Sequence, residues 1–238
     1  MPKRGKRYRS ANERVDADRL YEPEDALSVV REGATAKFDE TVELHLRTGL
    51  DGRHAEQQIR GSVTLPHGLG REQTVIVFAE GEAVSQALEA GANEAGGDEL
   101  IQRVADGWTE FDVAIAQREL MGKVGRLGRI LGPRGLMPNP RNNTVLDAEN
   151  IPRAVREGKS GRVEFRLDRT NLVHMALGKA SFSDEQLSEN LGAIMAEIVK
   201  ARPADIKGQY IRAATLTSTM GPGVHVDVQP LLALAAET

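Results

Sequence analysis

Cysteine is absent from this sequence of 238 residues, which excludes disulfide bonds, cysteine-ligated zinc and thiol nucleophiles. No uninterrupted apolar run approaches the roughly 18 residues that a membrane-spanning helix needs, so we expect no membrane partner. Aromatic residues are scarce, at 4%, and the formal net charge is −4. The remaining composition, 40% hydrophobic and 28% charged, is typical of a soluble globular protein with one large or two small domains.

The basic residues are concentrated in two segments, although the chain as a whole is acidic. Residues 1–10 contain five basic residues and no acidic one. No hydrophobic stretch follows them, so the segment does not resemble a secretory signal and we expect a cytoplasmic protein. Residues 121–146 also carry five basic residues and no carboxylate. Surface fields extend only about 10 Å at ordinary salt, so each segment is compatible both with anion binding and with a solvated face.

The middle of the chain alternates short apolar runs with segments of helical periodicity, bracketed by glycine-rich junctions at 66–70 and 158–161. This alternation predicts a parallel sheet covered on both faces, as in a Rossmann-like domain. The strands are expected at 74–79 and 112–116, and the helices at 82–90, around 100–104 and at 148–157.

The two ends of the chain show a different pattern. Val42, Leu44 and Leu46 alternate with polar residues, as do the apolar residues of 163–167 and 224–228, which predicts antiparallel strands with one buried face. Helices are expected from Pro23 onwards and after a capping box at 183–186. Neither end alone has enough strands for a good sheet. We therefore predict an α/β (α+β) protein with two domains: a discontinuous antiparallel-sheet α+β domain from 1–67 and 160–238, and a Rossmann-like α/β domain inserted at 68–159.

Signatures of enzymes and metal sites are not recognisable. The run Gly158-Lys159-Ser160 resembles the end of a phosphate-binding loop, but Arg153 stands where that motif needs glycine. The histidines lack metal-ligand spacing, and carboxylates alone identify no acid–base pair. We therefore expect no catalytic residues, no cofactor and no metal. The rival hypotheses are a nucleotide-dependent enzyme built on the middle domain and a scaffold that binds acidic proteins through residues 121–146.

Three segments carry side chains that folding alone does not require. Residues 125–140 hold arginines on a path that glycines and prolines are expected to make irregular and exposed, which suits contacts to phosphate. Residues 36–41 place Phe38 beside a lysine and a threonine, where the ring could stack on a base, although an isolated phenylalanine is more typical of a core. Residues 215–222 crowd four hydroxyls before a turn, which suits close approach to ribose but also an ordinary threonine-rich strand.

In this order, these segments resemble the L-one family of large-subunit ribosomal proteins, in its bacterial form. The resemblance runs from one end of the chain to the other. Its most specific motif is Gly128-Arg-Ile-Leu-Gly-Pro-Arg-Gly-Leu-Met-Pro-Asn-Pro140. The other matching segments are 3–8, 36–45, 61–68, 165–170, 178–182 and 217–222.

The resemblance implies the same two-domain fold and a noncatalytic function. A member is expected to bind large-subunit rRNA directly, to form the mobile stalk near the E site among other large-subunit components, and to assist release of deacylated E-site tRNA. It is also expected to repress its own operon by binding the mRNA. The rRNA-binding residues carried over by motif are Lys37, Phe38, Thr41, Arg166, Asp168, Arg169, Thr170, Thr217, Ser218, Thr219, Met220 and Gly221. Additional RNA contacts are expected at Lys3, Arg4, Lys6, Arg7, Arg126, Arg129 and Arg134.

Three positions depart from the common pattern of the family. Ser218 stands in place of a threonine and Arg169 in place of a lysine, and both keep a hydrogen-bond donor. Gly52 stands where many members have proline, and we expect a looser turn there that does not touch the RNA-binding face. Because that face offers hydroxyls and glycine but few aromatic residues, we expect recognition by shape, ribose and backbone. Few phosphate contacts should then give a shallow salt dependence.

Overall fold

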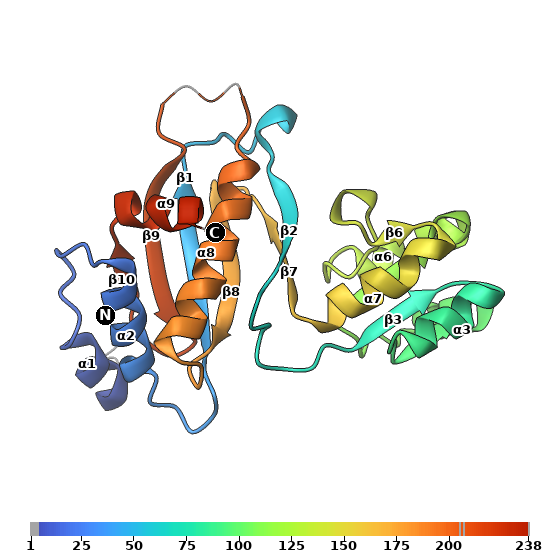
Figure 1. Cartoon of the computed structure of the whole chain (residues 1–238), viewed down its shortest axis with the longest axis horizontal. Helices are drawn as coiled ribbons and strands as arrows, with labels where there is room; N and C mark the ends of the chain where they lie inside the picture. Colours follow the sequence, from blue (N-terminus) through green and yellow to red (C-terminus); the bar gives the residue numbers. More distant parts are fainter. Residues whose placement is uncertain (1–4, 205, 207, 238) are drawn as a thin grey trace. The chain divides into compact units, whose positions relative to one another are not determined.

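The computed structural model describes residues 5–204, 206 and 208–237, and the chain divides into two compact units (Figure 1). Unit 1 combines both ends of the chain, Met1–Gly70 and Val163–Thr238, and unit 2 is the continuous segment Arg71–Arg162. The predicted boundaries, 67/68 and 159/160, each lie three residues before those of the units. The predicted fold class, a mixed α/β chain with one antiparallel and one parallel sheet, is confirmed.

Unit 1 is built around a four-stranded antiparallel sheet in the order β10–β9–β1–β8. A separate two-stranded sheet pairs β2 with β7. Strand β1, from the N-terminal part, lies between two strands from the C-terminal part, so neither part forms this sheet alone. The strands are β1 (Thr41–Thr48), β2 (Arg60–Thr64), β7 (Arg162–Arg166), β8 (Leu172–Lys179), β9 (Ile211–Ser218) and β10 (Val224–Val226).

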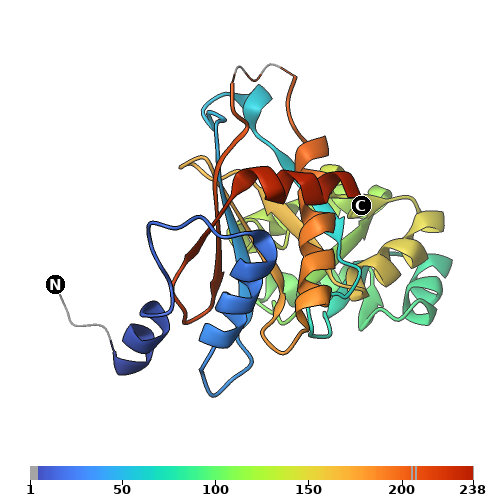
Figure 2. The same cartoon turned by 60° about the vertical axis from the view of Figure 1, so that its left-hand side comes forward.

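Alternation along β1 decides which face of this sheet is buried. Val42, Leu44 and Leu46 are fully buried, whereas the residues between them are half-buried, as predicted. In Figure 2 the helices coloured orange and red, α8 and α9, lie on one side of the strands. The expected capping box opens α8: the Ser183 hydroxyl accepts from the Gln186 N–H, and the Gln186 side chain accepts from the Ser183 N–H. The helices of unit 1 are α1 (Lys6–Asn12), α2 (Pro23–Gly33), η1 (Ala55–Gln57), α8 (Asp184–Lys200) and α9 (Val228–Glu237).

Helix α9 corrects the sequence-based assignment of residues 224–228 to one strand. The strand β10 ends at Val226, and Val228 already belongs to α9. The reason lies in Asp227, whose carboxylate accepts a hydrogen bond from the Gln229 N–H at 3.0 Å and so caps the first helical turn. Three valines at alternating spacing are too short a pattern to outweigh a cap.

Unit 2 has a four-stranded parallel sheet in the order β4–β3–β5–β6. Its strand β3 is buried on both faces, because Ile76 and Phe78 belong to one apolar core and Val75 and Val77 to another. This is the arrangement that the apolar runs predict. The elements are β3 (Val75–Phe78), α3 (Glu82–Glu89), β4 (Glu94–Gly96), α4 (Asp98–Ala105), β5 (Val113–Gln117), η2 (Arg118–Leu120), α5 (Met121–Val124), η3 (Gly125–Leu127), α6 (Gly128–Leu131), η4 (Pro140–Asn142), β6 (Val145–Leu146), η5 (Ala148–Asn150) and α7 (Ile151–Lys159).

The expectation of an irregular path from residue 125 is wrong for its first part. The chain forms successive helical turns, η3 and α6, because Val124, Leu127 and Leu131 recur at helical spacing and are buried. Gly158 is likewise a helical residue of α7 rather than part of a linker, and a Cβ there would lie 3.3 Å from the Val75 side chain. Among the described residues, no helix is long and apolar enough to cross a membrane.

Candidate nucleic-acid interface

Most of the predicted rRNA-binding residues meet where β1 begins and β9 ends. We call Lys37, Phe38, Thr41 and residues 217–221 the first cluster. Antiparallel pairing of β1 with β9 brings its two parts together from opposite ends of the sequence. The Thr41 N–H donates to the Thr219 hydroxyl at 2.9 Å, and the Thr219 N–H donates to the Thr41 carbonyl at 3.0 Å.

Glu40 joins the two parts of the first cluster, although its side chain was not among the predicted site residues. It is only 2% exposed. Its carboxylate accepts from the Ala36 N–H at 2.8 Å, from the Met220 N–H at 2.9 Å and from the Ser218 hydroxyl at 2.8 Å. Burial raises the pKa of Glu40. The three hydrogen bonds and the charge of Arg7 together lower it by more, so that the pKa lies below its ordinary value. We call this carboxylate with its three donors the Glu40 clasp.

The Glu40 clasp holds two apolar side chains at the surface. Phe38 is 55% exposed and Met220 is 49% exposed. The interpretation of Phe38 as a core residue is therefore wrong: the segment 34–40 is bound through its backbone, through Glu40 and through Asp39, whose carboxylate accepts from the Ser181 N–H and hydroxyl, and the ring stays in solvent. Exposed apolar groups beside a polar loop are the kind of surface on which bases stack.

The hydroxyls of the first cluster differ in how accessible they are. Ser218 is only 2% exposed and its hydroxyl is held by Glu40, so the structure corrects the expectation that this hydroxyl faces an RNA. The Thr217 hydroxyl donates to the Ser218 and Pro222 carbonyls of its own turn. Among the hydroxyl-bearing residues of the first cluster, only Thr219 is exposed. Position 221 requires glycine for a steric reason, because a Cβ there would lie 2.5 Å from the Ser218 hydroxyl oxygen.

Arg166, Asp168, Arg169 and Thr170 form a second cluster, at the end of β7 and in the loop that leads to β8. Asp168 organises this loop: its carboxylate accepts from the Thr170 N–H at 2.8 Å, from the Thr170 hydroxyl at 2.5 Å and from the Leu172 N–H at 2.7 Å. Burial raises the pKa of Asp168, but these hydrogen bonds lower it below its ordinary value. Arg166 and Arg169 are exposed, and within the described part of the chain neither forms an ion pair.

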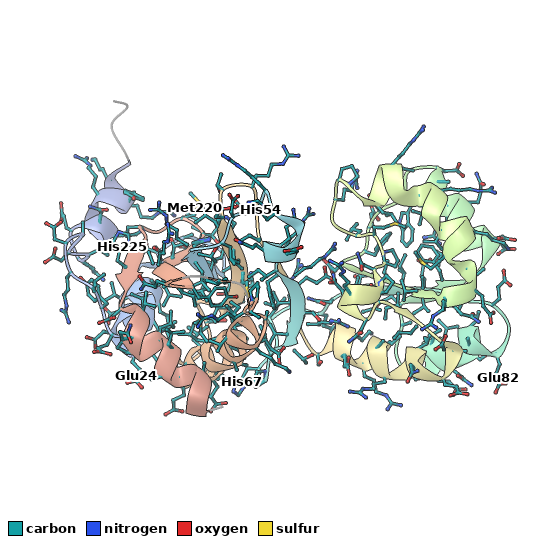
Figure 3. The ribbon with its side chains drawn as sticks, turned by 90° about the horizontal axis from the view of Figure 1, so that it is seen from above. Glu24, His54, His67, Glu82, Met220 and His225 are labelled. Carbon is teal, nitrogen blue, oxygen red and sulfur yellow. The ribbon has the colours of Figure 1, made fainter. Side chains whose placement is uncertain are left out.

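The two clusters lie at opposite ends of the sheet. Thr41 pairs with Lys179 at one end of β8, and Arg47 pairs with Leu172 at the other, next to the second cluster. At about 3.3 Å per residue, β1 separates the clusters by roughly 23 Å. Figure 3 shows Met220, His54 and His225 along one side of unit 1, with Glu24 and His67 along the opposite side.

A row of polar side chains crosses the sheet between the clusters. His45 is paired in register with His174 on one side and Thr215 on the other, and Thr215 is paired with His225. The Nδ1 atoms of His45 and His174 lie 2.8 Å apart, so one ring donates and the other accepts. Burial and the neighbouring His174 lower the pKa of His45, against the opposing effect of Glu43. The period-two pattern places these residues on one face, but only the strand order reveals the row.

The additional basic residues are distributed over both units. Lys3 and Arg4 lie outside the described residues. Lys6 and Arg7 are exposed on α1, and Arg7 is near enough to Glu40 to influence its pKa. In unit 2, Arg126 and Arg129 are exposed on η3 and α6, and Arg134 donates to the Thr109 hydroxyl.

Comparison with known proteins identifies the family. The model of the ribosomal protein L1p/L10e family matches residues 30–222. The chain belongs to this family. A protein of Chloroflexus aurantiacus named large ribosomal subunit protein uL1 is 56% identical over 228 residues, which cover 95% of this chain and 96% of that protein. Proteins of the same name from Thermomicrobium roseum and Clavibacter sepedonicus are each 52% identical, over 96% of this chain and 95% and 99% of their own lengths.

Membership of the L1 family confirms the predicted class, a bacterial large-subunit ribosomal protein. The family is structural and not enzymatic, so the nucleotide-dependent enzyme is set aside. In unit 2, the side chains at the carboxyl ends of β3 and β5 also argue against a nucleotide site, although doubly wound sheets bind nucleotides at this edge. There the Lys123 ammonium lies 3.1 Å from a Glu80 oxygen and 2.8 Å from an Asp98 oxygen. Two carboxylates at this position disfavour a phosphate.

Proposed function

We propose that this L1-family chain binds large-subunit rRNA directly through the first and second clusters of unit 1. The observation that carries the proposal is the Glu40 clasp, because it holds exposed Phe38 and Met220 at one edge of the sheet from two distant parts of the chain. The Phe38 ring suits stacking on an unpaired base, the Met220 thioether suits apolar contact beside it, and the Thr219 hydroxyl suits a ribose hydroxyl. The exposed guanidiniums of Arg166 and Arg169 suit backbone phosphates.

The charge distribution supports recognition that depends little on phosphate contacts. The whole chain carries a net charge of −4, and the first cluster contains one basic residue, Lys37. We therefore expect the logarithm of affinity to fall only shallowly with the logarithm of salt concentration, at roughly 0.7–0.9 per phosphate contact. A slope typical of about ten contacts would contradict this mode of binding.

The direct test is the affinity of the full-length protein for a fragment of the stalk region of large-subunit rRNA. Phe38→Ala is expected to weaken binding by about 5- to 150-fold, since stacking contributes about 1–3 kcal/mol per base. Because Phe38 is exposed, the unfolding temperature of the Phe38→Ala variant should differ little from that of the wild type. Leu20→Ala is the matched control: Leu20 is 63% exposed in the same unit but lies outside both clusters. Equal affinity of the two variants would refute the proposal.

The finer roles are those that the resemblance to the family implies. We propose that the chain works in the cytoplasm as part of the mobile stalk near the E site, assists release of deacylated tRNA, and represses its own operon by binding the mRNA. If rRNA and mRNA share the first cluster, Phe38→Ala should weaken both to a similar extent, and the two RNAs should compete. If Arg126 and Arg129 contact tRNA, replacing both by alanine should weaken tRNA binding and leave rRNA affinity unchanged.

A further inference from the structure

A pocket of about 840 Å³ in unit 1 joins the second cluster to a turn that the sequence resemblance left out of the interface. One wall is the loop of the second cluster. The other is the turn that precedes β2. The lining residues are Gly52, Arg53, Gln58, Arg166, Leu167, Asp168 and Arg169.

Gly52 fastens this turn to the loop of the second cluster, so the turn is held in place and is not the loose turn expected from the glycine. Its N–H donates to the Asn171 side chain at 2.9 Å. A Cβ at position 52 would lie 3.0 Å from the Asp168 carbonyl oxygen and 3.3 Å from the Asn171 side-chain oxygen, so the absence of a side chain permits the close approach. Gln58 holds the turn from the other side by donating to the Gly52 carbonyl at 3.0 Å. Arg53 is therefore presented on a fixed backbone beside the second cluster.

The pocket has an excess of positive charge. Three of its side chains are arginines and one is a carboxylate, Asp168, whose oxygens already accept three hydrogen bonds from its own loop. Arg53 is 91% exposed, and the nearest carboxylate oxygen, on Asp51, lies 4.0 Å away. An ion pair so long and so exposed holds the guanidinium weakly. A guanidinium that is held only weakly can bind phosphate through two parallel N–H donors.

We propose that this pocket binds a backbone phosphate of the RNA and that Arg53, which lies outside both clusters, is an RNA-binding residue. The proposal rests on the proposed rRNA-binding function and extends its surface across the end of the sheet. Arg53 supplies the guanidinium of one wall, and Arg166 and Arg169 supply those of the other. Gly52 and Gln58 act as positioning residues through the backbone of the turn.

The test measures binding of the full-length protein to the same rRNA fragment over a series of salt concentrations. Arg53→Ala should weaken binding about five- to eightfold at 0.1 M salt and reduce the log–log slope by roughly 0.7–0.9, the effect of one lost phosphate contact. Arg53→Lys should keep the slope, because the charge remains. It should lose part of the affinity, because lysine lacks the planar guanidinium with its two parallel donors. Since Arg53 is almost fully exposed, all variants should unfold at the wild-type temperature.

Arg19→Ala is the matched control, because Arg19 is an exposed arginine of unit 1 that pairs with Asp25 at 3.2 Å, away from the pocket. Its affinity and slope should equal those of the wild type. If Arg53→Ala also matches the wild type while Phe38→Ala loses binding, the pocket proposal is wrong and the rRNA-binding proposal stands. If the wild-type protein does not bind the fragment, both fall.

Discussion

Replacing Glu40 by glutamine tests the Glu40 clasp with the smallest change of shape that the chain allows. The amide keeps one acceptor oxygen but puts a nitrogen where the other carboxylate oxygen stood. In one orientation that nitrogen faces the Met220 N–H, and in the other it faces the Ala36 N–H. Either way, one backbone donor loses its acceptor, whereas the Ser218 hydroxyl can rotate and accept instead.

The magnitude follows from these contacts. An unsatisfied buried donor costs about 1–3 kcal/mol, and the remaining hydrogen bonds lose the contribution of the negative charge. We expect Glu40→Gln to lower the free energy of unfolding by about 2–3 kcal/mol, measured by urea denaturation at pH 7. The same variant should weaken binding of the rRNA fragment at least about tenfold, because Phe38 and Met220 are no longer held at fixed positions.

The pH dependence gives a second measurement on the same variant. Since the folded-state pKa of Glu40 lies below its ordinary value of 4.5, the unfolded chain binds more protons, and the stability from this group is lost as pH falls below about 4.5. Glu40→Gln should remove that part of the acid dependence. Glu164→Gln, an exposed carboxylate of β7, is the control and should change stability by less than about 0.5 kcal/mol. Unfolding of Glu40→Gln at wild-type urea concentrations would refute the role of the clasp.

Three other variants test features of unit 1. Burial raises the pKa of Tyr210 to about 12, so the stability it contributes is lost as pH rises from about 10 towards 12; Tyr210→Phe should abolish that loss in alkaline urea titrations, and costs about 1 kcal/mol at neutral pH through the lost bond to a carbonyl. The pKa of His45 is lowered, so the stability that this residue contributes falls as pH drops below about 6.5. In His45→Gln the urea midpoint should therefore change less between pH 7.5 and pH 5.5 than it does in the wild type. Asn190 is fully buried and bonds to the His67 N–H and to two carbonyls; Asn190→Ala should cost about 2–4 kcal/mol in the same assay, and a loss under 1 kcal/mol would contradict its bridging role.

Local patterns were sufficient for the elements whose sequence matches their environment. The alternation at Val42, Leu44 and Leu46 predicts β1 and its buried face, and the apolar run at 74–79 predicts a strand covered on both sides, which the structure has as β3. The helical turns from residue 125 to 131 differ from the expected irregular path, because the spacing of Val124, Leu127 and Leu131 outweighs the glycines and prolines of this segment.

The candidate site was predictable residue by residue only where a motif carried it. What could not be predicted is which side chains meet, because strand order and register bring together residues such as Glu40 and Met220 that are 180 positions apart. Strand alternation does place Ser218 on the buried face of Leu216, opposite Thr217 and Thr219, but nothing local indicated that Phe38 points outward. The pocket beside Gly52 depends on two loops approaching each other, and spacing along the chain carries no sign of that approach.

The position of β1 between β8 and β9 also affects how the chain acquires its structure during synthesis. About 120 residues separate the end of β1 from the start of β8, and β9 is made later still. At roughly 5–20 residues per second, β1 waits about 6–25 seconds with both edges unpaired, while the continuous segment of unit 2 can fold as soon as it emerges. The unpaired edges of such a strand can form hydrogen bonds with strands of other chains. A nascent chain that stops before residue 211 lacks β9 and residues 217–221, so the first cluster, the RNA-binding edge that we propose, stays incomplete until this last strand of the sequence is made.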